Sequence, residues 1–96
     1  MPRRHRCRRV GCQPSFTSFG PATAGNSKPE ETILTVDEFE ALRLKDLEGL
    51  GQNECAVMME ISQPTFHRLV ISARRKVAGA LTHGRTIKIE GGHYRL

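Results

Sequence analysis

Residues 52–71 read QNECAVMMEISQPTFHRLVI, and small and apolar residues occupy fixed places in this stretch. A short helix that crosses a longer one through a three-residue turn requires a small residue where the two backbones meet. Ala56 takes that place. The turn requires an apolar residue, Ile61, and the longer helix requires the apolar anchors Phe66 and Leu69. The stretch therefore predicts a helix-turn-helix.

One position of this turn departs from the usual pattern. The turn usually has a left-handed backbone conformation there, which glycine adopts without strain, but the residue in this chain is Glu60. If Glu60 keeps that conformation, the strain costs on the order of 1 kcal/mol. The backbone angles of Glu60 are therefore the local test of the prediction.

A first helix is predicted to begin at Thr35. Thr35 and Glu38 have the spacing of a capping box, in which the hydroxyl accepts from the third helical amide and the carboxylate reaches back. Gly49 and Gly51 are expected to end this helix. Its apolar stripe is formed by Val36, Phe39, Leu42 and Leu47, with Leu44 as an extra.

A longer helix is predicted over residues 63–81, after a short helix at residues 52–59. Ser62 is a good N-cap, Pro64 is tolerated in the first turn, and Gly84 is expected to end the helix. Its apolar face is formed by Phe66, Leu69, Val70, Ala73, Val77, Ala80 and Leu81.

The segments on either side of residues 32–84 differ from them in composition. Residues 1–31 carry four of the five prolines and are expected to form an irregular, basic arm. Residues 85–96 alternate in hydrophobicity around Gly91 and Gly92, which predicts a short β-hairpin. Because the edges of a lone hairpin need a partner, we expect it to join two chains in a homodimer. The predicted fold is mainly α, a three-helix helix-turn-helix domain between the arm and the hairpin.

Positive charge exceeds negative charge and the two are segregated along the chain. The 96 residues carry 15 Lys and Arg against 10 Asp and Glu, a formal net charge of +5. Nine acids lie within residues 30–60, whereas residues 61–89 carry six cations and no acid. This pattern predicts an acidic helix layer with a basic helix laid against it. The excess favours a polyanionic partner, most simply nucleic acid.

If the helix at residues 63–81 lies in the major groove, the stripe facing away from its apolar anchors reads bases. Gln63 is expected to bind adenine and Arg68 to bind guanine, because their side chains match those base edges with two hydrogen bonds. His67 is expected to donate to a base or a phosphate, and Ile71 to contact a thymine methyl group.

Phosphate contacts are expected from hydroxyls beside the helix N-terminus, from cations farther along the helix and from arginines of the arm. We therefore expect a transcriptional regulator that binds double-stranded DNA as a dimer, since one motif makes few base contacts. The predicted DNA-binding residues are Ser62, Gln63, Pro64, Thr65, His67, Arg68, Ile71, Arg74, Arg75, Arg3 and Arg4.

An ordered set of short stretches covers nearly the whole chain. They are CRRV at 7–10, FGP at 19–21, LTVDEFEALRL at 34–44, DLEGL at 46–50, SQPTF at 62–66, ARRKV at 73–77, IEGG at 89–92 and YRL at 94–96. On these residues the chain is similar to a small prokaryotic family called domain of unknown function 134, and residues 34–81 resemble region 4 of sigma-70-type factors. The resemblance implies a sigma-region-4-like helix-turn-helix whose recognition helix opens at Gln63, a role in transcription and no established ligand.

The three cysteines do not make a disulfide framework, because their number is odd. His5, Cys7 and Cys12 form the one cluster near metal spacing, but structural zinc requires four ligands, and the fourth would come from His83 or His93. We therefore expect no metal and no cofactor. A regulator that senses thiol oxidation or metal through Cys7 and Cys12 stays an alternative, since arginines beside a thiol favour its reactive, ionised form.

Several function classes are not expected from this sequence. There is no Ser–His–Asp order, carboxylate pair or phosphate loop, so we expect no enzyme. No apolar run reaches the roughly 20 residues of a membrane span, and no apolar signal-peptide segment follows the N-terminal arginines, so we expect a cytoplasmic protein. Protein docking through residues 30–60 and RNA binding through Phe16, Phe19 or Tyr94 are further alternatives.

Overall fold

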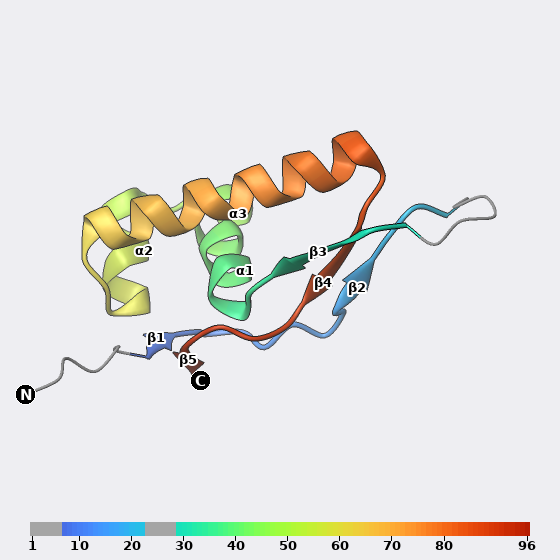
Figure 1. The fold of residues 1–96 in the computed structure, drawn as a ribbon. Helices are drawn as coiled ribbons and strands as arrows, with labels where there is room; N and C mark the ends of the chain where they lie inside the picture. Colours follow the sequence, from blue (N-terminus) through green and yellow to red (C-terminus); the bar gives the residue numbers. More distant parts are fainter. Residues whose placement is uncertain (1–6, 23–28) are drawn as a thin grey trace, which may run out of the picture.

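The computed structural model describes residues 7–22 and 29–96. One long helix, α3, lies over two shorter helices at its N-terminal half and over a small sheet at its C-terminal half (Figure 1). The described part of the chain is a small, mainly α domain with short strands. Its elements are β1 (Arg8–Arg9), β2 (Ser18–Phe19), β3 (Glu31–Leu34), α1 (Val36–Leu42), the π-helical turn η1 (Arg43–Leu47), α2 (Gln52–Met59), α3 (Gln63–His83), β4 (Thr86–Ile89) and β5 (Tyr94–Arg95).

The helix ends follow the predicted caps. The Thr35 side chain accepts from the Glu38 amide at 3.3 Å, and Glu38 Oε1 accepts from the Thr35 amide at 2.9 Å, so the capping box is formed. Ser62 caps α3 by accepting from the Thr65 amide at 3.2 Å. Gly84 ends α3 in the left-handed conformation with φ 65°. The helix runs two residues beyond its predicted end at residue 81.

A wide turn in η1 changes the apolar stripe of the first helix. The Glu48 amide donates to the Arg43 carbonyl at 2.9 Å, an i to i+5 bond that adds a residue to the turn. Leu44 consequently lies in the core with 1% exposure, while Leu47 is 78% exposed. The prediction that Leu47 belongs to the buried stripe is therefore wrong, because a regular helical period does not continue through this turn.

The predicted hairpin at residues 85–96 is wrong. β4 is the central strand of a three-stranded sheet, antiparallel to β2 and parallel to β3, whereas β5 pairs in parallel with β1 in a second sheet. Between β4 and β5 the chain passes α1, where the Val36 amide donates to the Gly91 carbonyl at 3.1 Å. Both edges of β4 are thus paired within one chain, which removes the reason for assigning this segment to dimerisation.

The arm is more ordered than predicted. Two short strands, β1 and β2, lie within residues 7–22, and β3 begins at the last residue assigned to the arm. Val10 is 1% exposed and packs with Leu34, Val36, Ala73 and Ile89 in a second hydrophobic cluster. This segment is consequently part of the domain, with its buried side chain between the sheet and α3.

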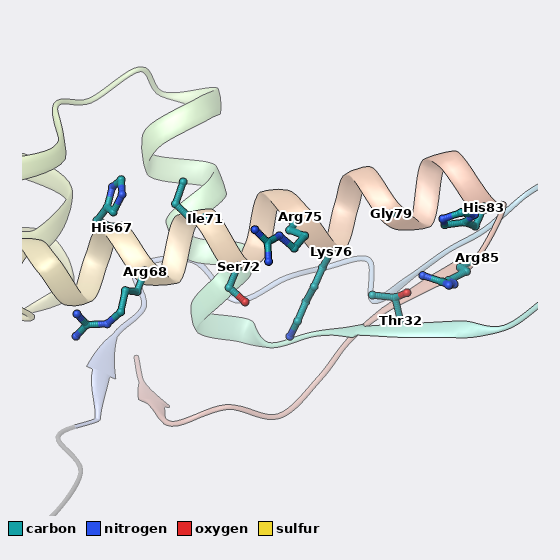
Figure 2. A pocket seen from close by; sticks show the side chains of 10 residues that line it. All are labelled: Thr32, His67, Arg68, Ile71, Ser72, Arg75, Lys76, Gly79, His83 and Arg85. Carbon is teal, nitrogen blue, oxygen red and sulfur yellow. The ribbon is translucent and has the colours of Figure 1, made fainter.

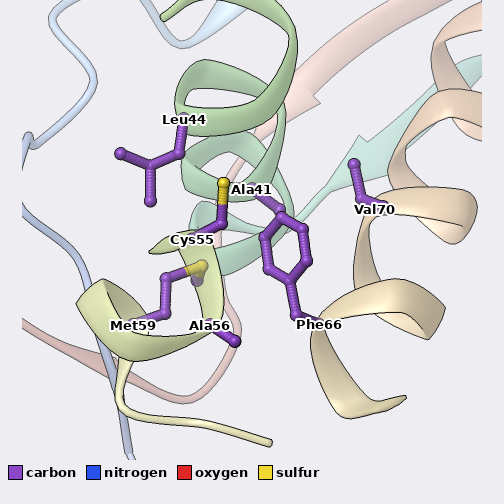
Figure 3. Packing of buried hydrophobic residues seen from close by; sticks show 7 residues of the cluster. All are labelled: Ala41, Leu44, Cys55, Ala56, Met59, Phe66 and Val70. Atoms are coloured by element: carbon purple, nitrogen blue, oxygen red, sulfur yellow. The ribbon is translucent and has the colours of Figure 1, made fainter. Parts of the chain in front are cut away.

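The main core lies where α1, η1, α2 and α3 meet. The ring of Phe66 reaches from α3 toward α1 and α2 (Figure 3). This cluster consists of Ala41, Leu44, Cys55, Ala56, Met59, Phe66 and Val70. Because Phe66 and Val70 point inward, the opposite side of the first half of α3 faces away from the core.

Candidate nucleic-acid interface

A tight turn joins α2 to α3. Glu60 has φ 58° and ψ 44°, the left-handed conformation that glycine usually takes in such a turn. The Ile61 amide donates to the Ala56 carbonyl at 3.0 Å, and the Ile61 side chain packs against the main core. Glu60 also forms an ion pair with Arg95 of β5. The turn therefore has the backbone conformation expected at this position despite the absence of glycine.

The first turns of α3 carry a polar network around the N-cap. The Ser62 hydroxyl donates to Thr65 Oγ1 at 2.9 Å, and Arg68 Nη2 donates to the same oxygen at 3.3 Å. Gln63 Nε2 donates to Asn53 Oδ1 of α2 at 3.0 Å. These groups are all at the surface, so each of these hydrogen bonds can be exchanged for one to a ligand.

The outward stripe of α3 is exposed. Phe66, Val70 and Ala73 are buried on the inner side, whereas the predicted base-reading residues lie on the outer side. Ile71 is 39% exposed although it is a large apolar side chain. The exposed residues of the stripe are Gln63, Pro64, His67, Arg68, Ile71 and Arg75, and Thr65 is half-buried beside them.

A groove of about 620 Å³ follows this stripe from the N-terminal half of α3 to β3 (Figure 2). The side chains that line it include cations and imidazoles and no carboxylate. The lining residues are Thr32, His67, Arg68, Ile71, Ser72, Arg75, Lys76, Gly79, His83 and Arg85. Four of the predicted site residues thus share one concave surface with residues outside the predicted DNA-binding set. The four are His67, Arg68, Ile71 and Arg75, and the others are Thr32, Ser72, Lys76, Gly79, His83 and Arg85.

Arg74 stands apart from this groove. Its Nε and Nη2 donate to the two carboxylate oxygens of Asp46 at 3.0 and 2.6 Å. The hydrogen bond from Arg74 holds the pKa of Asp46 below its usual value, and Asp46 raises the pKa of Arg74. Of the predicted DNA-binding residues within the described ranges, Arg74 is the one held by a bidentate ion pair.

Lys76 lines the groove but is already paired. Its Nζ lies 2.7 Å from Glu38 Oε1, and the Ser72 hydroxyl donates to Glu38 Oε2 at 2.6 Å. Burial raises the pKa of Glu38, but the hydrogen bonds from Lys76, Ser72 and the Thr35 backbone outweigh it and lower the pKa below 4.5. Glu38 is therefore an ionised carboxylate that links α1 to the middle of α3.

Two further buried acids of α1, Asp37 and Glu40, contact residues of the N-terminal segment. Asp37 forms an ion pair with Arg8 of β1 at 3.1 Å. Glu40 accepts from Arg43 Nε at 2.7 Å and from the Gly11 amide at 2.8 Å. The sequence did not single out these contacts, although the run of acids beside the capping box was visible. These acids hold the arm against α1, so they serve packing rather than the exposed groove.

Some predicted residues lie elsewhere. Arg3, Arg4 and His5 are outside the described residues. Cys7 and Cys12 are exposed, and within residues 7–22 and 29–96 no three His, Cys, Asp or Glu side chains gather as metal ligands would. Cys55 is buried in the main core, and burial raises the pKa of its thiol. In the same ranges, no helix has the length and apolar character needed to cross a bilayer.

Comparison with known proteins places the whole chain in one family. A family model described as "Protein of unknown function DUF134" matches residues 1–96. A UPF0251 protein of Thermoanaerobacter pseudethanolicus is 55% identical over 96 residues, which cover all of this chain and 81% of the relative. A UPF0251 protein of Caldanaerobacter subterraneus is 53% identical over the same length, again covering 81% of the relative. No solved structure matches the chain. The chain therefore belongs to the DUF134 family, together with these UPF0251 proteins.

Proposed function

We propose that this protein binds double-stranded DNA through the outer side of α3 and acts as a transcriptional regulator. In this proposal α2, the turn at Glu60 and α3 form a helix-turn-helix. The observation that carries the proposal is the groove along α3, which exposes Arg68 and Arg75 without any carboxylate in its lining. Unpaired cations such as these two attract the phosphates of DNA.

The dimensions of α3 suit the major groove. An α-helix with its side chains is about 10–12 Å in diameter, and the major groove is about 12 Å wide. The first two turns of α3 carry Gln63, His67 and Arg68 on the exposed side, so these side chains would meet base edges. Arg68 is the strongest candidate for guanine, because within residues 7–22 and 29–96 its guanidinium is held by one 3.3 Å hydrogen bond to Thr65.

The rest of the stripe supports the same orientation. Ile71 lies one turn beyond His67 and would contact a thymine methyl group or a sugar. Arg75 lies one turn farther and would contact a phosphate. At the other end, Ser62 and Thr65 stand beside the α3 N-terminus, where the partial positive charge of the helix attracts an anion. We leave Arg74 out of this interface because Asp46 already occupies its guanidinium.

The test is duplex binding by fluorescence anisotropy over a salt series. We expect wild-type affinity to fall steeply with salt, with a slope of about −0.9 per phosphate contacted. Arg68→Ala should weaken binding to a duplex selected from random sequence by about tenfold to a hundredfold, the worth of one good base contact. It should also relax the choice of base at one position.

Arg74→Ala is the matched control, since it removes the same side chain from the same helix on another side. We expect it to bind within about twofold of wild type, because it loses no contact in the proposed interface. Absence of duplex binding at low salt would refute the proposal. Equal losses from Arg68→Ala and Arg74→Ala would refute the assignment of the outer stripe.

A further inference from the structure

The groove along α3 continues beyond the residues assigned to base reading. Its far end lies between the C-terminal half of α3 and β3, where Thr32, His83 and Arg85 surround Gly79 (Figure 2). Arg85 enters this end from the segment between α3 and β4. The proposed helix-turn-helix contact does not use these four residues, so the function of this end of the groove is open.

Helix length separates the two ends. From Arg68 to His83 is 15 residues, or about 22 Å along the axis at 1.5 Å per residue. The major groove is only about 12 Å wide. If Arg68 reads a base, the side chains near Gly79 lie beyond the rim of the groove, at the depth of a sugar–phosphate strand.

Gly79 is not required by the packing of the protein itself. Glycine within a helix is destabilising relative to alanine. A Cβ at this position would approach Arg85 Nη1 at 3.7 Å, which is ordinary van der Waals contact. The missing side chain leaves the backbone of α3 open to close approach from the groove, between the cations Arg75 and Arg85.

From this arrangement we infer that the far end of the groove binds a backbone phosphate of the same DNA. Arg75 and Arg85 supply the charge, and Thr32 and His83 lie within the lining as further hydrogen-bonding groups. The inference rests on the proposed function and extends it, because it makes the sheet a part of the DNA interface and lengthens the contacted duplex to one side.

Two opposing effects are smaller than this attraction. The C-terminal end of a helix carries about half a negative elementary charge, whereas Arg75 and Arg85 bring two full positive charges. Arg85 Nε lies 3.4 Å from Glu30 Oε2, but the Glu30 side chain is 82% exposed. Such a surface pair contributes little, so a phosphate can replace the carboxylate.

The experiment measures duplex affinity, its salt slope and Tm for wild type and three variants. Arg85→Ala should bind about tenfold more weakly and its salt slope should be smaller by about 0.9, the loss of one phosphate contact. Gly79→Ala should have a higher Tm, since alanine is the better helix former, and yet bind DNA more weakly. Lys88→Ala is the control, because Lys88 is similarly exposed and paired with Glu31 but does not line the groove.

The outcomes separate this inference from the proposed function. If wild type binds and Arg68→Ala weakens binding, but Arg85→Ala behaves as Lys88→Ala does, the far-end phosphate site is refuted and the base-reading face stands. Gly79→Ala binding as tightly as wild type would refute it equally. If wild type binds no duplex, the proposed function itself fails, and the phosphate site fails with it.

Discussion

Two groups of cations lie within residues 61–89, and they differ in what they contact. Four are paired with acids that precede them in sequence, while Arg68 and Arg75 form no ion pair with any residue of the described ranges. The four pairs are Arg74 with Asp46, Lys76 with Glu38, Arg85 with Glu30 and Lys88 with Glu31. Two of these pairs, Arg74 with Asp46 and Lys76 with Glu38, join the basic helix α3 to acids of η1 and α1, as the charge pattern predicted.

The difference between the groups shows that the neighbours of a cation in the fold, rather than its position in the sequence, decide whether it is available to bind phosphate. Lys76 and Arg74 are equally positive, but their carboxylate partners offset their attraction for phosphate. Asp46 binds Arg74 through two hydrogen bonds of 3.0 and 2.6 Å, and Glu38 is 4% exposed. Glu30, in contrast, lies 3.4 Å from Arg85, and its side chain is 82% exposed. One region of charge therefore stabilises the domain, and the other is available to a ligand.

The largest expected effect comes from removing the buried acid Glu40, whose ion pair with Arg43 stabilises the domain. Glu40 is 1% exposed and binds both Arg43 and the Gly11 amide. Glu40→Ala should lower the free energy of unfolding by about 3 kcal/mol, because Arg43 loses its buried partner and the Gly11 amide loses its acceptor. Urea denaturation measures this loss, and DNA affinity per folded molecule should stay unchanged.

Glu48→Ala is the matched control for that experiment. Glu48 is exposed and lies 3.4 Å from the same Arg43, so its removal should cost no more than about 0.5 kcal/mol. Equal effects from the two variants would show that burial does not distinguish these two acids.

The next effect concerns pH and the pair of Glu38 with Lys76. The folded protein lowers the pKa of Glu38 below its ordinary 4.5, so the stabilisation is complete above pH 4.5 and is lost as the pH falls through the folded value. Glu38→Gln should destabilise by about 1–2 kcal/mol at pH 7 and by less at pH 3. Thermal unfolding at both pH values measures it, and a constant difference would contradict the assignment.

A smaller change in stability is expected from the backbone strain at Glu60, in the turn between α2 and α3. Glu60→Gly and Glu60→Ala both remove the ion pair with Arg95, but only glycine removes the strain of the left-handed conformation. The glycine variant should therefore be more stable than the alanine variant by about 1 kcal/mol. Equal stability in chemical denaturation would mean that the turn relaxes without cost.

The smallest expected effect comes from removing the ion pair of Arg74, which tests whether an unpaired Arg74 contributes to DNA binding as Arg68 and Arg75 are proposed to do. Asp46→Asn should cost about 0.5 kcal/mol or less, because both partners are more than 40% exposed. It should change duplex affinity by less than about twofold at physiological salt, where exposed charges are screened beyond about 8 Å. A tenfold gain in anisotropy titrations would instead place Arg74 within the DNA interface.

The ends of the helices were predictable because their signals are local. The capping box at Thr35, the N-cap at Ser62 and the stop at Gly84 each depend on a few neighbouring residues. The turn before α3 was predictable for the same reason, and even its uncommon residue, Glu60, keeps the expected conformation. The π-helical turn at Arg43–Leu47 was not predictable, because its one sign in the sequence is that Leu44 falls outside the regular helical stripe.

The sheets were not predictable because their partners are distant in sequence. β3 pairs with β4 across more than 50 residues, and β1 pairs with β5 across more than 80. Gly91 and Gly92 suggested a hairpin turn, and both have positive φ, but Gly92 is needed where the chain passes Asp37. A Cβ there would collide with the carboxylate.

The exposed stripe of α3 could be listed from helical period alone, since Phe66 fixes which side of α3 faces inward. The far end of the groove could not, because Thr32 and Arg85 reach it through the sheet. Nor could the sequence separate Arg74 from Arg75, two adjacent arginines of which one is bound to Asp46.

The pairing of β1 with β5 has a consequence for synthesis of the protein. β5 leaves the ribosome long after β1, by about 4–17 s at 5–20 residues per second. During that interval Arg8 and Val10 have no strand to pair with, since the amides of both residues donate to carbonyls in residues 93–95. The helices can form earlier from their own local contacts, so the nascent chain exposes α3 before its arm is closed.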